Sequence, residues 1–122
     1  MSQEMRQPVR QEWRGFLDSV TQELEGEPVT IEVVTAELGS RVEAERLPLS
    51  FISYDEKDEV VIVSVLGRDG GDPVLEHMVQ DPWKILFDPP SPGAVRTIDV
   101  EGADGAHTLV TLHGRELPGA ET

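Results

Sequence analysis

The side chains with acid-base potential in this sequence gather around His77. Glu76 precedes it and Asp81 follows four residues later, and an imidazole beside a carboxylate is a common arrangement for proton transfer. On a helical turn His77 and Asp81 would share one face, whereas on a strand His77 and Glu76 would point to opposite faces. His77 with Asp81 is therefore a candidate catalytic pair. The simpler interpretation of His77 is a hydrogen-bonded structural residue or an interface residue.

A second candidate site comes from carboxylates in two neighbouring segments. Glu32 belongs to one alternating apolar and polar segment, and Glu43 and Glu45 belong to the next. If these segments pair as strands, the three carboxylates share one face, where they repel one another or bind a cation. The simpler interpretation is a solvated acidic face that Arg41 and Arg46 partly neutralise.

Motifs for other chemistries are missing from the sequence. It contains no cysteine, which excludes disulfides, thiol nucleophiles and thiolate metal sites. The loop from Arg68 to Pro73 has two adjacent glycines but lacks the spacing of a phosphate-binding loop. His107 and His113 share strand parity, yet the strand between them spans about 20 Å, so they cannot bind one ion together. We therefore expect no cofactor.

The charge of the chain restricts its partners. It has 24 acidic and 10 basic residues, a net charge of −14. Such a charge repels the phosphates of nucleic acids and anionic membranes, so we expect binding to neither, and it favours a basic protein partner. No run reaches the roughly 18 apolar residues of a membrane span, and residues 1–11 lack the apolar core of a secretory signal. These features predict a soluble cytoplasmic protein.

One amphipathic helix is predicted near the N-terminus. Pro8 suits its first turn, and Gly26 is suited to end it. The predicted apolar stripe follows helical spacing and consists of Val9, Trp13, Phe16, Leu17, Val20 and Leu24.

The remaining elements are predicted to be strands. The β-branched run Val60 to Val65 indicates a central strand covered on both faces, joined to Ile52–Tyr54 by a charged turn at residues 55–58. Residues 74–80 fit a strand or a short helical turn, with a break at Asp81-Pro82 in either case. Gly105 can take the positive φ that a final hairpin needs. The other predicted strands cover residues 29–33, 42–45, 83–87, 96–101 and 106–112.

Together these elements predict an α+β fold in which the N-terminal helix packs on an antiparallel, meander-like sheet of about seven strands. Whether the sheet curls into a partial barrel is left open. Residues 1–7 are expected to form a flexible arm, residues 8–113 a single domain, and residues 114–122 a flexible tail.

Several of these segments resemble a bacterial family catalogued as domain of unknown function 5335. The resemblance covers roughly residues 8–113. It departs from the family pattern at Glu56, where proline is usual, and at Phe51, where a small residue is usual. It implies a small bacterial protein with no assigned activity, so it transfers no catalytic residue. The segments that carry it are Glu12-Trp13, Leu47-Pro48-Leu49, Ile52 to Asp58, His77 with Pro82 and Ile85, and Asp104-Gly105.

The function expected from the sequence is a non-enzymatic protein-interaction or regulatory module, because the chain has a good core and no assembled chemistry. Two alternatives stay open: a small-ligand or cation-binding domain, and an enzyme that uses His77 with a nearby carboxylate. A homodimer through the apolar segment Trp83 to Phe87 is a separate expectation.

Overall fold

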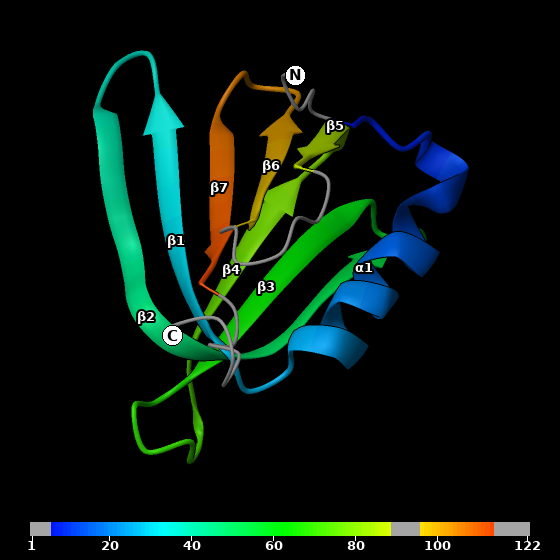
Figure 1. Cartoon of the computed structure of the whole chain (residues 1–122). Helices are drawn as coiled ribbons and strands as arrows, with labels where there is room; N and C mark the ends of the chain where they lie inside the picture. Colours follow the sequence, from blue (N-terminus) through cyan, green and yellow to red (C-terminus); the bar gives the residue numbers. More distant parts are fainter. Residues whose placement is uncertain (1–5, 89–95, 114–122) are drawn as a thin grey trace, which may run out of the picture.

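The computed structural model describes residues 6–88 and 96–113, which form one α-helix and a seven-stranded antiparallel sheet (Figure 1). The strand order is β4-β3-β2-β1-β7-β6-β5. The predicted α+β fold is confirmed, and residues 74–80 lie in a strand. The elements are α1 (Arg10–Leu24), β1 (Pro28–Thr35), β2 (Gly39–Asp55), β3 (Val60–Leu66), β4 (Pro73–Gln80), β5 (Pro82–Phe87), β6 (Arg96–Gly102) and β7 (His107–Leu112).

Helix α1 begins one residue later than the stripe predicted. Val9 is the N-cap residue and is exposed, and its backbone N–H donates to the Glu12 carboxylate at 3.2 Å. Pro8 therefore precedes the helix and does not lie in its first turn. Gly26 follows the helix with a φ of 88°, as predicted. The buried stripe consists of Trp13, Leu17, Val20 and Leu24, with Phe16 half-buried beside it.

Strand β2 joins two segments that the sequence predicted as separate strands. Its first part pairs with β1 and its second part with β3. Near the change of partner, Glu45 and Arg46 together oppose the single residue Thr30, and Arg46 has a φ of 53°. Such a bulge bends a strand and increases its twist. Figure 1 shows β2 running along β1 and then curving beneath it towards β3.

The hydrophobic core lies between α1 and the concave face of this bent sheet. Alternation along each strand places one set of side chains on that face, so helix and sheet share one cluster. Strand β3 supplies Val61, Val63 and Val65, although it lies next to the edge strand β4 and not at the centre of the sheet as predicted. The other core residues of the sheet include Val29, Ile31, Leu49, Ile52, Tyr54, Ile85, Ile98, Val100, Val110 and Leu112.

Helix α1 also replaces a missing strand neighbour of β2. Beyond Pro48, β2 has left β1, so one side of its backbone needs other partners. The Thr21 hydroxyl donates to the carbonyl oxygen of Ile52 at 2.8 Å and accepts from the backbone N–H of Ile52 at 2.9 Å. One helix side chain therefore satisfies both groups, which fixes α1 against the sheet.

The sheet curls without closing into a barrel. In the described part of the chain, β4 and β5 are its two edges. They meet only at the corner residue Asp81, whose φ is 49° and whose backbone bonds to Glu59 and Ala103. Arg6, predicted in a flexible arm, pairs with Phe87 of β5. The rest of that arm before residue 6, and the predicted tail at 114–122, lie outside the described residues.

Candidate functional site

The structure does not assemble the predicted catalytic pair of His77 and Asp81. Because residues 74–80 form a strand, His77 points to the concave face, as the buried Val79 does, whereas Glu76 points to the outer face. The imidazole Nε2 lies 3.1 Å from the hydroxyl oxygen of Thr108 on β7. Asp81 is exposed at the corner and is held there through its backbone. His77 is thus a hydrogen-bonded residue that joins β4 to β7.

The surroundings of His77 favour its neutral form. Burial lowers the pKa of the imidazole below its ordinary value, and the carboxylate of Glu43 opposes this by raising it. Burial dominates because a charged imidazole loses water that the protein does not fully replace. A neutral imidazole either donates its Nε2 proton to the Thr108 hydroxyl or accepts the hydroxyl proton.

We expect the lowered pKa of His77 to make the protein less stable in mild acid. As pH falls through about 6.5, the unfolded chain binds a proton at this position while the folded protein resists it, so the free energy of unfolding decreases. In the His77→Gln variant this contribution is absent. Urea unfolding at pH 7.5 and 5.5 should therefore show a larger loss of stability for the wild type than for His77→Gln. Equal losses in the two proteins would contradict this account.

The three candidate cation ligands are held apart by the strand register. Glu32 lies opposite Val42, and its carboxylate accepts a hydrogen bond from Ser40. Glu43 is 3.1 Å from Arg41. Glu45 is exposed. Within residues 6–88 and 96–113, no three His, Asp or Glu side chains converge as a metal site requires.

Sequence reasoning missed a charged cluster on the outer face of the β6–β7 hairpin. His107 Nδ1 is 3.0 Å from Asp99 Oδ1, and its Nε2 is 4.0 Å from Glu101 Oε2. The hairpin register, with Glu101 opposite His107, brings them together. The turn at Asp104-Gly105 could have revealed this register. Both ring nitrogens already face carboxylates, so the arrangement is typical of a structural cluster that ties β6 to β7.

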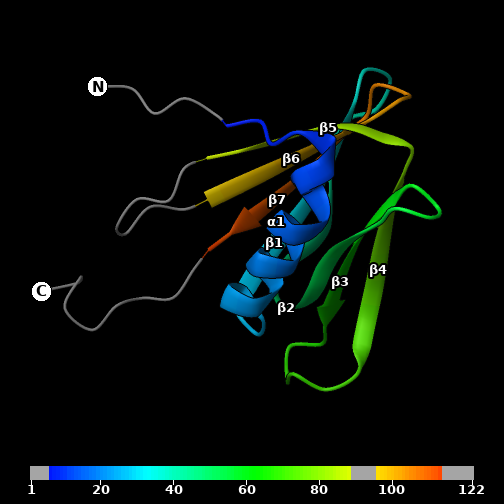
Figure 2. The ribbon, with the colours of Figure 1, turned by 90° about the vertical axis from the view of Figure 1, so that its right-hand side faces the viewer.

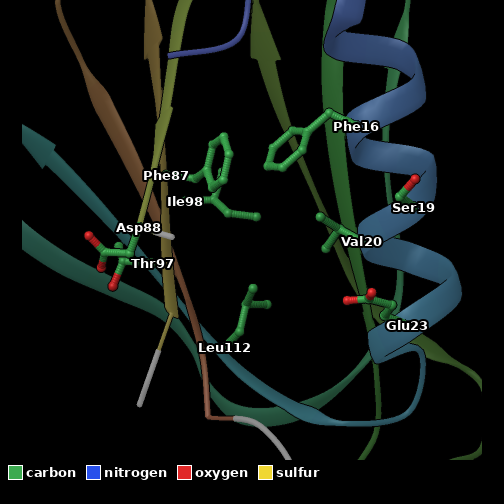
Figure 3. Close-up of a pocket in the computed structure, with 9 residues that line it drawn as sticks. All are labelled: Phe16, Ser19, Val20, Glu23, Phe87, Asp88, Thr97, Ile98 and Leu112. Carbon is green, nitrogen blue, oxygen red and sulfur yellow. The ribbon is translucent and has the colours of Figure 1, made fainter. Parts of the chain in front are cut away.

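An apolar cavity of about 190 Å³ lies between α1 and strands β5, β6 and β7 (Figure 3). The side chains that face one another across it are Phe16, Val20, Phe87, Ile98 and Leu112. Asp88 and Thr97 point away from this group, and Glu23 lies at its margin. Ligand sites usually add several converging polar groups that orient the ligand. The cavity has space for a small apolar molecule, but its described lining lacks a converging set of polar groups that would orient one.

The outer face of β4 carries exposed apolar side chains. Met78 is 50% exposed and Val74 is 59% exposed on β4, and Met78 lies opposite the half-buried Ile62. Phe51 stands where the family pattern usually has a small residue. It lies opposite Ser64 on the same face and is half-buried. Figure 2 shows β4 at the border of the sheet. Apolar side chains at a sheet edge are typical of interaction surfaces.

The described residues thus define a small α+β domain with an open antiparallel sheet. In this part of the chain, no helix has the length and apolar character needed to cross a membrane. The chain belongs to the Family of unknown function (DUF5335), whose model matches residues 4–118. This confirms the resemblance seen in the sequence and extends it at both ends.

A relative with substantial coverage is an uncharacterized protein from the bacterium Aquifex aeolicus (strain VF5). It is 29% identical over 103 residues, which cover 84% of this chain and 86% of the relative. No solved structure matches the chain. Neither the family nor this relative carries an assigned function.

Proposed function

We propose that this protein is a cytoplasmic, non-enzymatic interaction or regulatory module that binds a basic protein partner. The observation that carries the proposal is the acidic surface of the domain. The chain has 14 more acidic than basic residues, and most of the described carboxylates are exposed. A field of one sign attracts a partner of the opposite sign and speeds its association.

The arrangement of the candidate chemical groups supports an interaction role over an enzymatic one. His77 hydrogen bonds to Thr108, and His107 lies between Asp99 and Glu101. An enzyme needs a nucleophile, acid or base that faces a substrate cavity. The apolar cavity beside α1 is lined by neither histidine, so this cavity would not bring a substrate to His77 or His107.

A direct test uses two labelled peptides that differ in charge. Each has eight residues, the length of β4; one alternates lysine with valine and the other alternates glutamate with valine. We expect fluorescence anisotropy to show the lysine peptide binding at least about tenfold more tightly, with an affinity that falls as salt increases because exposed charges are screened. Equal affinities, or no binding of the lysine peptide, would refute the proposal.

A further inference from the structure

We propose that β4 binds an extended basic segment of a partner protein as an added β-strand. This inference rests on the proposed function and assigns it a surface and a binding mode. Strand addition uses the unpaired backbone groups of an edge strand for affinity and alternate side chains for specificity. Strand β4 offers both features.

The backbone of β4 is open on one side. Residues Leu75 to Gln80 pair one to one with β3, Pro73 pairs with Leu66, and Val74 is the extra residue of a bulge between them. No described strand lies beyond β4. Figure 2 shows β4 outermost in the sheet. Edge strands are usually protected by lysine or proline or by a covering segment. Pro73 and the bulge at Val74 protect only the start of β4. From Leu75 to Gln80 there is no proline and no lysine, and Glu76 is the sole acidic side chain.

The opposite edge, β5, is protected. The backbone of Arg6 exchanges two hydrogen bonds with Phe87, at 2.7 and 2.8 Å. The Arg10 guanidinium donates to the carbonyl oxygen of Pro82 at 3.2 Å. The chain before and at the start of α1 therefore contacts both ends of β5, and Lys84 lies between them. This difference selects β4 as the edge for a partner.

The side chains around β4 indicate the chemistry of that partner. Between Asp55 and Asp81 the chain has eight carboxylates and two basic residues, a net charge of −6 with His77 neutral. Glu76 lies between the exposed Val74 and Met78 on the outer face of β4. An added strand would place a basic side chain beside Glu76 and apolar side chains beside its two neighbours. The preferred segment therefore alternates basic and apolar residues.

A second copy of this chain fits the edge less well than a basic segment. Two β4 strands paired about a two-fold axis would bring two acidic segments of net charge −6 together. Like charges across a sheet are destabilising. The homodimer predicted through Trp83–Phe87 uses the other edge, where Arg6 and Arg10 already bind.

The test combines a modified peptide with two charge variants of the full chain. A fully N-methylated lysine-valine peptide keeps the side chains and the charge but has no backbone N–H groups, so we expect its affinity to fall by more than about tenfold. Glu76→Lys should weaken binding of the unmodified peptide about fivefold. Glu37→Lys, in the exposed β1–β2 turn, changes the net charge by the same amount as Glu76→Lys. It should weaken binding by less than about half as much, because it lies away from β4.

The outcomes separate this inference from the proposed function. Loss of binding on N-methylation, together with slower hydrogen exchange of β4 amides in the complex, supports strand addition. Unchanged affinity of the N-methylated peptide, or equal effects of Glu76→Lys and Glu37→Lys, overturns strand addition and leaves the preference for a basic partner standing. Failure of the wild type to prefer the lysine peptide overturns both. Dimerisation through β4, seen by light scattering with lost β4 exchange, also overturns the inference.

Discussion

Replacing Trp13 with alanine is expected to lower the free energy of unfolding by about 3–5 kcal/mol, the usual loss for a large aromatic side chain in a core. Trp13 is 2% exposed. Its ring meets the Tyr54 ring edge-on, with centroids 5.2 Å apart, and its indole N–H donates to the carbonyl of Pro8 at 3.1 Å. The substitution removes these contacts and leaves a void between α1 and β2. In urea, the unfolding midpoint followed by circular dichroism should fall by about 2 M.

The second tryptophan provides a matched control. Trp83 is 57% exposed on β5, so its removal takes little apolar surface from the core. Trp83→Ala should change the free energy of unfolding by about 0.5 kcal/mol or less. If both variants lost a similar free energy of unfolding, the packing of Trp13 between α1 and the sheet would not be the source of its stabilising effect.

Replacing Thr21 with valine should destabilise the protein by about 2 kcal/mol. Valine has nearly the same shape as threonine but cannot hydrogen bond, so the backbone N–H and carbonyl of Ile52 lose their partner in α1. Groups left unpaired in a partly buried position cost more than an average hydrogen bond contributes. Urea unfolding of the variant would measure the loss.

Serine at the same position separates the hydroxyl from the methyl group. Thr21→Ser keeps the donor and acceptor and should lose about 1 kcal/mol or less, through a missing methyl group. The interpretation of α1 as a substitute strand neighbour would be wrong if Thr21→Ser and Thr21→Val were equally destabilised.

The local elements of the fold could be predicted because their signals are local. The stripe from Trp13 to Leu24 has helical spacing, and the run from Val60 to Val65 is β-branched. The bent strand β2 was divided in two, because Arg46 at positive φ and the extra residue opposite Thr30 look like a loop in the sequence. Sequence patterns do not distinguish a bulge inside a strand from a gap between strands.

The candidate site was less predictable because it depends on partners distant in the chain. The bond between His77 and Thr108 joins residues 31 positions apart. The register of the β6–β7 hairpin brings together Asp99, Glu101 and His107. A change of this register by one residue would move every side chain of a strand to the other face. Glu32, Glu43 and Glu45 were grouped by parity, but the second bulge of β2, at Glu43, breaks that parity.

The acidic charge, the absence of thiol chemistry, the amphipathic helix and the alternating strands follow from the amino-acid order alone, because composition and side-chain periodicity are properties of single segments. Three features are visible only in the folded protein: β1 pairs with β7, α1 satisfies the backbone of β2, and β4 is open while β5 is covered. These features arise from contacts between distant segments, and a bulged strand sets their geometry. No local pattern encodes which edge of the sheet is left free.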